Sequence, residues 1–267
     1  MGVKELDMVV LRQDMQIKRL NFNQDSGAGS RARLGLLVLE SDQTMEWEFR
    51  DLTHLPGVSV YHSRLANSVT VTPETLAAME KELPSAANLL PQYLCLTAIG
   101  YGCTSGSTVI GESRVSEIIA QSHPGVPSTN PLSAAKAAFE ALGVSRIGLL
   151  TPYTPDVTQA MQFSFDKAGI SVQVVGSFYE DSDEVVGRID DRSILEGVLE
   201  VGASADVDAV FVSCTSLRAA SVIPKAEDIL NKPVTASNHA LAWHMLRLAG
   251  IQDTNPNAGR LFQLQMI

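Results

Sequence analysis

The sequence predicts an α/β fold made of two similar lobes, each a parallel sheet flanked by helices. Apolar runs of strand length alternate with segments of helical pattern, which is the order of parallel βαβ units. The segments 34–39 and 146–150 are rich in consecutive apolar residues, as expected for strands that are covered on both faces. The second half of the chain also repeats motifs of the first half in the same order.

The elements of the first half follow from apolar runs and helix-start signals. Thr44 is placed to cap a helix that runs to about residue 52. Thr72 is placed to cap a second helix, which Pro73 opens because proline is favoured in the first turn. The remaining predicted strands are 58–61 and 94–100, and the remaining predicted helices are 106–121 and 131–142.

The second half shows the same alternation after its first strand. Gly169 and Gly250 each follow a helical pattern, and glycine commonly ends a helix in the left-handed conformation. The predicted helices are 155–168, 193–201, 216–230 and 237–249, and the further predicted strands are 170–176 and 207–212.

The internal repeat consists of four pairs of short matching segments. Arg33-Leu-Gly-Leu-Leu37 recurs as Arg146-Ile-Gly-Leu-Leu150, Gly57-Val-Ser-Val60 as Gly169-Ile-Ser-Val172, Cys103-Thr-Ser105 as Cys214-Thr-Ser216, and Val109-Ile110 as Val222-Ile223. The offsets are all 111 to 113 residues. A general likeness between α/β units would not fix both order and spacing, so the repeat predicts two equivalent lobes.

The lobe boundaries are predicted from two segments, 127–143 and 233–250, that begin with proline and contain a helix ending at glycine. We interpret these segments as crossovers between the lobes. The first lobe is then 31–126 plus 237–267, and the second is 127–236. Residues 1–30 are expected to be an irregular N-terminal extension.

The composition limits the classes of function. Lys and Arg number 20 against 30 Asp and Glu, a net charge of −10, which argues against a nucleic-acid partner. Residues 1–20 carry charges throughout, so we expect no signal peptide and no membrane partner. Three cysteines without a CxxC motif, and histidines without ligand spacing, predict a cytoplasmic protein with free thiols and no metal.

Two Cys-Thr-Ser loops are the strongest functional signal. Cys103 and Cys214 each follow an apolar strand, and the carboxyl ends of such strands are where open α/β sheets bind ligands. The N–H groups at the start of a following helix favour a thiolate or carboxylate. One such cysteine is usually structural, but two at equivalent positions predict a pair facing one cleft. Cys95 has no counterpart and is expected in the core.

These loops resemble those of maleate cis–trans isomerase and arylmalonate decarboxylase, in the aspartate/glutamate racemase superfamily. The resemblance extends from about residue 34 to residue 250. The motifs that carry it are Gly102-Cys-Thr-Ser-Gly106, Ser213-Cys-Thr-Ser-Leu-Arg218, Thr151-Pro-Tyr153 and Pro233-Val-Thr-Ala-Ser-Asn238. It implies two pseudo-symmetric Rossmann-like lobes with the active site between them, no cofactor, a small carboxylate substrate, and a homodimer or higher homo-oligomer.

The resemblance also implies roles for individual residues. Both cysteines belong to the isomerase and racemase pattern, whereas the decarboxylase keeps only the second, so Cys103 and Cys214 are the predicted catalytic residues. Tyr153 would donate a hydrogen bond to a substrate carboxylate. The amides and hydroxyls that would hold carboxylate oxygens belong to Thr104, Ser105, Thr215 and Ser216.

One stretch departs from the family pattern. Maleate isomerases carry Ser-Asn-Thr, with a substrate-contacting Asn, where this chain reads Ser41-Asp-Gln-Thr44. Gln43 takes the place of that Asn, and Asp42 adds a negative charge that would repel maleate unless it pairs elsewhere. A substrate with an ammonium or amide in place of one carboxylate would avoid that repulsion. The stretch resembles the ectoine-utilisation branch of the family.

Four hypotheses of function follow. In a cis–trans isomerase, the Cys103 thiolate adds to an alkene carbon and Cys214 supplies a proton. In a racemase or epimerase of an amino acid or diaminobutyrate derivative from ectoine catabolism, the two thiols act as opposed bases. The third hypothesis is decarboxylation of an arylmalonate-type acid. The fourth is a non-catalytic small-molecule binding protein, in which paired thiols would have no purpose.

Overall fold

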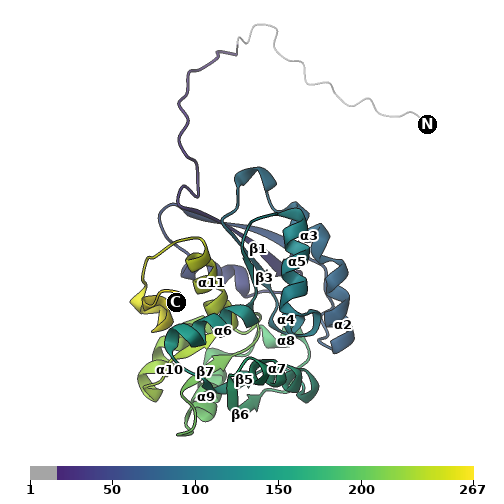
Figure 1. The fold of residues 1–267 in the computed structure, drawn as a ribbon, viewed down its shortest axis with the longest axis vertical. Coiled ribbons are helices and arrows are strands. Elements are labelled where there is room, and N and C mark those ends of the chain that lie inside the picture. The colour runs from purple at the N-terminus through teal and green to yellow at the C-terminus, as the bar shows by residue number, and fades with distance from the viewer. Residues whose placement is uncertain (1–16) are drawn as a thin grey trace, which may run out of the picture.

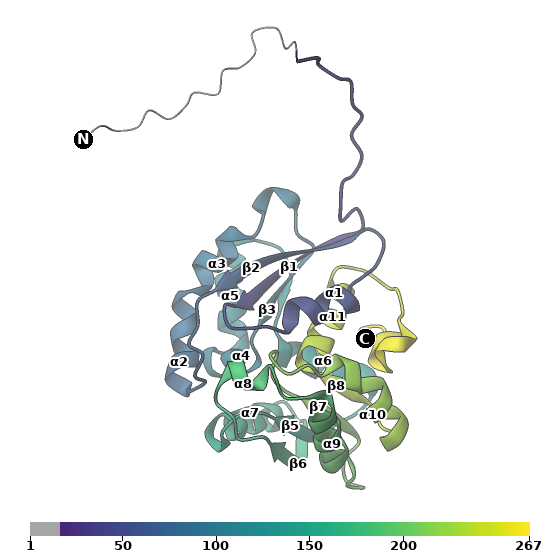
Figure 2. The ribbon, with the colours of Figure 1, turned by 180° about the vertical axis from the view of Figure 1, so that it is seen from behind.

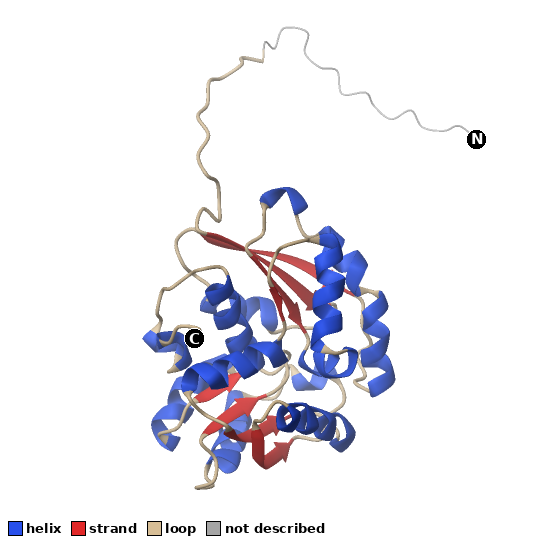
Figure 3. Ribbon diagram, in the orientation of Figure 1, coloured by secondary structure: helices blue, strands red, loops and turns tan. Residues whose placement is uncertain are grey.

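The computed structural model describes residues 17–267, which form two four-stranded parallel sheets (Figures 1 and 3). Their strand orders are β2-β1-β3-β4 and β6-β5-β7-β8, so the two halves repeat one topology. The predicted two-lobed α/β fold is confirmed. The first sheet contains β1 (Ala32–Leu39), β2 (Val58–Leu65), β3 (Ala98–Gly102) and β4 (Ser128–Thr129). The second contains β5 (Arg146–Thr151), β6 (Ser171–Ser177), β7 (Ala209–Val212) and β8 (Val234–Ala236).

Helices cover both faces of the first sheet. Along β1, Leu34, Leu36 and Val38 pack toward α1 (Met45–Leu52) and α11 (Ser237–Leu248), which lie side by side (Figure 2). Leu37 and Leu39 point to the opposite face. That face is covered by α2 (Pro73–Ala78), α3 (Leu83–Leu89), α4 (Thr104–Ile110) and α5 (Glu112–Ser122). This two-sided burial explains the uninterrupted apolar character of the strand.

The second sheet is covered in the same way. On one face, Phe139 of α6 (Pro131–Leu142), Phe165 of α7 (Pro155–Lys167) and Phe211 of β7 form a cluster of edge-to-face rings 5.5 to 5.9 Å apart. The other face carries α9 (Asp191–Gly202) and α10 (Ile223–Leu230). A short helix, α8 (Asp183–Val186), follows β6.

The two crossover helices join the lobes. α6 packs on the second sheet with Phe139 and on α11 with Ala134 and Ala138, while α11 lies against β3 and α1. The C-terminal segment therefore returns to the first sheet. The exact division at residues 126/127 and 236/237 stays a prediction. Residues 17–30 contain no helix or strand, and the rest of the predicted extension lies outside the described residues.

Several predicted boundaries are wrong for identifiable reasons. The strand predicted from Leu94 starts at Ala98, because residues 92–94 form a 3-10 turn and Cys95 is left-handed with φ 50°. The helix predicted over 106–121 begins earlier and breaks into α4 and α5 at Gly111, whose φ of 96° no other residue adopts easily. The strands β4 and β8 were not predicted, because they are only two and three residues long and contain no long apolar run.

The start of the helix predicted over 216–230 is also wrong. Residues 213–219 form a loop, then a 3-10 turn leads into α10 at Ile223. The loop carbonyls that a helix would use are taken elsewhere: Thr44 donates to the Ser216 carbonyl and Asn238 to the Thr215 carbonyl, both at 2.8 Å. No helix in the described chain is long and apolar enough to cross a membrane.

Candidate active site

A small cavity lies between the lobes, at the carboxyl ends of the central strands. Its volume is about 10 Å³, close to the space that one water molecule needs. The first lobe contributes Leu39, Asn67, Ser68, Thr70, Val71, Thr75, Leu76, Met79, Cys103, Thr104 and Ser105 to its wall. The second contributes Tyr153, Asp183, Cys214 and Thr215. Both predicted cysteines therefore face one cavity, with four of the six other predicted site residues.

The first thiol is placed by the sharp turn from β3 into α4. Cys103 is the N-cap residue of α4, and its Sγ accepts a hydrogen bond from the Gly106 N–H at 3.2 Å. The Ser105 hydroxyl lies 3.7 Å from the same sulfur. Only glycine fits at position 106, because a Cβ there would lie 2.5 Å from the Tyr101 hydroxyl. Burial nevertheless raises the pKa of Cys103 to about 12.

The second thiol sits in a strained loop after β7. Cys214 has φ 104°, an uncommon conformation for a residue with a side chain. Its N–H donates to the Ser237 hydroxyl at 3.0 Å, which helps to hold that conformation. Burial raises the pKa of the Cys214 thiol, so both thiols are protonated at neutral pH.

Each thiol has a buried tyrosine side chain beside it, and the Tyr101 hydroxyl donates to Met79 Sδ at 4.0 Å. Tyr153 lies beside Cys214, as a residue of the predicted site. Tyr101 lies beside Cys103 from within β3 and is completely buried. Tyr101 was not predicted as a site residue, although its position two residues before the cysteine was a usable signal.

Ser237 connects the two cysteine loops. Its hydroxyl accepts from the Cys214 N–H and lies 2.7 Å from the Thr104 hydroxyl. The Thr215 hydroxyl donates to the Gly102 carbonyl across the lobes at 3.4 Å. Because Ser237 begins α11, the crossover helix fixes the distance between the two loops.

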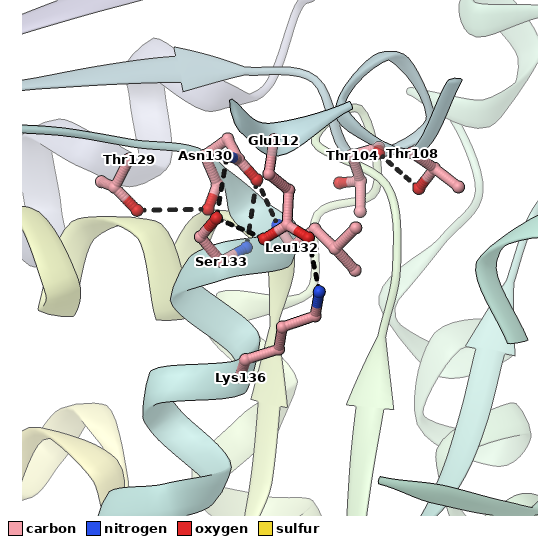
Figure 4. A network of polar contacts seen from close by, with 8 residues as sticks. All are labelled: Thr104, Thr108, Glu112, Thr129, Asn130, Leu132, Ser133 and Lys136. Carbon is pink, nitrogen blue, oxygen red and sulfur yellow. Dashed lines mark hydrogen bonds and ion pairs between the residues drawn. The ribbon is translucent and has the colours of Figure 1, made fainter. Parts of the chain in front are cut away.

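The helix that follows Cys103 is anchored at its far end. The Thr108 hydroxyl donates to the Thr104 carbonyl at 3.0 Å within α4 (Figure 4). Beyond the break at Gly111, the Glu112 carboxylate contacts Ser133 and pairs with Lys136, both on α6 (Figure 4). These contacts tie the first cysteine loop to the crossover helix α6.

Two residues of the variant stretch are placed differently from expectation. The Thr44 side chain does not cap α1; instead the Asp42 carboxylate accepts from the N–H groups of Thr44 at 2.8 Å and Met45 at 2.7 Å. Asp42 is buried behind the cavity wall, and burial raises its pKa to about 6. The Gln43 side chain is exposed and does not line the cavity.

Ser216 and Cys95 also lie at positions other than those predicted. Ser216 lies just outside the cavity wall and donates to Asp183 at 3.3 Å. Cys95 is exposed rather than in the core, because the left-handed turn before β3 directs it outward. Asp183 was not predicted, since nothing in its local sequence marks a return of the chain to the site.

A short contact between the lobes forms part of the cavity wall. Thr70 and Ser182 form an antiparallel bridge, with the Val71 N–H donating to the Asp181 carbonyl and the Asp183 N–H to the Val69 carbonyl. We call segments 69–71 and 181–183 the clasp. It places α8, and with it Asp183, against the first lobe.

Thiol alkylation should separate the three cysteines by accessibility and charge. At neutral pH, we expect iodoacetamide to modify exposed Cys95 at least about tenfold faster than Cys103 or Cys214, because a protonated, buried thiol is a poor nucleophile. The rate at Cys103 should rise as pH increases toward its raised pKa. Peptide mapping by mass spectrometry measures each rate, and modification of Cys103 before Cys95 would contradict this account of the site.

Comparison with known proteins agrees with this geometry. Maleate isomerase from Alcaligenes faecalis is 26% identical over 243 residues, covering 86% of this chain and 95% of that protein. Arylmalonate decarboxylase from Bordetella bronchiseptica is 31% identical over 140 residues, covering 52% of this chain and 58% of that protein.

A solved structure of a Nocardia farcinica maleate cis–trans isomerase is similar over nearly its whole length. It is a cysteine-to-serine mutant with a covalently bound succinylcysteine intermediate, 25% identical, with a TM-score of 0.75, covering 87% of this chain and 98% of that one. The arylmalonate decarboxylase family model matches residues 58–262, which include both cysteine loops, Tyr153 and Asp183. This chain therefore belongs to the arylmalonate decarboxylase family.

Proposed function

We propose that this protein is a cofactor-independent isomerase that uses Cys103 and Cys214 on a small carboxylic acid, in the manner of maleate cis–trans isomerase. The observation that carries the proposal is the pair of thiols, from equivalent loops of two lobes, that line one cavity. A binding protein has no need of two such thiols. The succinylcysteine in the Nocardia isomerase supports a covalent route.

In the first step the Cys103 thiol loses its proton to water as the site opens, and the resulting thiolate adds to the substrate. We assign this role to Cys103, because the Gly106 N–H and the Ser105 hydroxyl can stabilise its negative charge. The new S–C bond forms as the alkene π bond breaks, and the electron pair moves to the carbon beside a carboxylate. We assign the binding of that carboxylate to Tyr153 and the loop hydroxyls, because they line the same cavity as both thiols.

The second thiol completes the cycle. Cys214 gives its proton to the carbanion, and the former double bond is then free to rotate. The Cys214 thiolate removes the proton again, the S–C bond breaks, and the alkene re-forms with the opposite geometry. No oxidation occurs. Cys214 regains its proton from the adduct, and the released Cys103 thiolate takes a proton back from water.

Proton NMR of the reduced enzyme in D₂O tests the proposal. We expect a cis-unsaturated acid such as maleate to be converted to its trans isomer. A different result would be entry of deuterium at the Cα position of aspartate or of diaminobutyrate derivatives, with no change to an alkene. That result would contradict the isomerase proposal and indicate a racemase, including one of the ectoine-utilisation type. Release of CO₂ from phenylmalonate would indicate a decarboxylase. Decarboxylation is the second candidate function because the Bordetella relative is an arylmalonate decarboxylase.

Substrate entry should require the clasp to open, because the cavity is too small for a four-carbon acid. Thr70 and Ser182 are a non-hydrogen-bonded pair of an antiparallel bridge. In such pairs the two Cα atoms are typically about 4.5 Å apart. That spacing suits a disulfide. We expect the oxidised Thr70→Cys/Ser182→Cys variant to lose activity and to regain it on reduction.

The single substitutions Thr70→Cys and Ser182→Cys, treated identically, control for oxidation of the natural thiols. Full activity of the cross-linked double variant would show that substrate enters by another path.

A further inference from the structure

The part of the cavity wall that the structure describes contains one acidic side chain, Asp183, and no basic one. Asp183 is the one charged residue among the described residues that line the cavity, where no Lys, Arg or His occurs. It is 5% exposed and takes part in no ion pair within the described chain. Burying a carboxylate without a neighbouring cation costs free energy. A ligand that donates a hydrogen bond or carries a positive charge would offset that cost.

The hydrogen bonds around Asp183 favour its ionised form. The Asn67 amide is oriented by the Ser41 N–H, which donates to Asn67 Oδ1 at 3.1 Å. Asn67 Nδ2 therefore donates to the Ser41 hydroxyl at 2.8 Å, and that hydroxyl donates to Asp183 Oδ2 at 2.7 Å. The Ser216 hydroxyl donates to Oδ1 at 3.3 Å. Both carboxylate oxygens thus accept, as an ionised carboxylate does, although burial raises the pKa of Asp183 above its ordinary value. Full ionisation of the carboxylate therefore needs a higher pH than for an ordinary aspartate, and is expected on the alkaline side of neutral.

A ligand with two carboxylates fits this wall poorly. One carboxylate can be held by the hydroxyls and amides of the cysteine loops, but the other would meet Asp183 in a space without a cation. The buried Asp42 behind the wall adds a second negative charge nearby. A carboxylate has room for about four hydrogen bonds, and the hydroxyls of Ser41 and Ser216 provide two. The remaining lone pairs can accept from a ligand that donates.

Resting on the proposed isomerase function, we propose that Asp183 determines specificity for an acid with a carboxylate at one end and a hydrogen-bond donor, an amide or ammonium, at the other. A half-amide of a cis-unsaturated diacid meets this description and keeps the activated alkene that thiol addition requires. The donor group would bind Asp183, while the carboxylate would lie between the two Cys-Thr-Ser loops.

Binding of unreactive analogues tests this proposal without requiring turnover. Calorimetry at mildly alkaline pH compares succinamate, which has one amide end, with succinate, which has two carboxylates. We expect the wild-type protein to bind succinamate about tenfold or more tightly, because like charges in contact weaken binding. In Asp183→Asn, the preference should fall by a similar factor, mostly through tighter succinate binding.

Asp181→Asn is the matched control, because it removes the same charge from an exposed neighbour in the clasp. It should keep the wild-type preference. Equal or tighter binding of succinate by the wild-type protein would overturn the proposal, whether or not Asp183→Asn folds. An unchanged preference in a folded Asp183→Asn variant would overturn it as well.

Turnover separates this inference from the function on which it rests. If neither maleate nor maleamate is isomerised, the proposed function fails, while the binding preference still reports on Asp183. If both are isomerised, the wild-type enzyme should favour maleamate through a lower KM, and Asp183→Asn should shift that preference toward maleate.

Discussion

Replacing either Cys103 or Cys214 by alanine is expected to lower kcat by about 10³-fold or more. Without Cys103 no covalent adduct can form, and without Cys214 the carbanion has no proton donor on the opposite side. The substitutions should leave the fold intact, because each removes only a sulfur atom. Steady-state kinetics with the preferred unsaturated acid, together with thermal unfolding, measures both effects.

Cys95→Ala is the matched control, since it removes an exposed thiol outside the cavity. It should leave kcat unchanged. A Cys214→Ala enzyme with full activity would contradict the two-thiol mechanism and favour a single nucleophile.

Replacing Glu48 by alanine is expected to lower the free energy of unfolding by about 3 kcal/mol. The Glu48 carboxylate is buried in α1 and accepts from the Ala220 N–H and from Asn238 Nδ2, both at 2.8 Å. Its removal leaves one buried donor, Asn238 Nδ2, and one half-buried donor, the Ala220 N–H, short of a partner. Asn238 also holds the Thr215 carbonyl, so the second cysteine loop should loosen. Chemical denaturation measures the change.

Glu46→Ala provides the control on the same helix, because Glu46 only forms an exposed ion pair with Arg64. We expect it to cost less than about 1 kcal/mol. An equally small effect of Glu48→Ala would show that this network adds little stability.

The protonation of Glu48 adds a pH signature. Burial raises its pKa from 4.5 to about 7, so the folded state binds the proton more tightly than the unfolded state. Its contribution to stability is therefore greatest below pH 4.5 and is lost as the pH rises to about 7. The Glu48→Gln variant should show a smaller loss of stability across that range.

Much of the fold could be predicted from local patterns. The βαβ alternation and the internal repeat predicted two equivalent lobes, and the identical strand orders confirm them. Thr72 caps α2 as expected, and Gly143 ends α6 in the left-handed conformation. These features depend on residues close in sequence. Cys103 and Cys214 could also be placed, because each lies at the carboxyl end of a strand in the repeat.

The parts that could not be predicted depend on contacts between distant segments. Asp183 reaches the cavity only because the clasp draws α8 to the first lobe. Asp42, rather than Thr44, caps α1. The sequence does not show which of several short polar residues in the same turn accepts the hydrogen bonds of the helix start. Gln43 lies outside the cavity because the same turn directs its side chain to the surface.

The most direct test of the central claim is to trap the covalent adduct on a defined thiol. The Cys214→Ser variant would be incubated with maleate or maleamate, and its intact mass and peptides measured by mass spectrometry. The two-thiol mechanism predicts a mass increase equal to one substrate molecule, located on Cys103. An unmodified Cys103 in an otherwise folded variant, with both acids tested, would contradict the covalent mechanism.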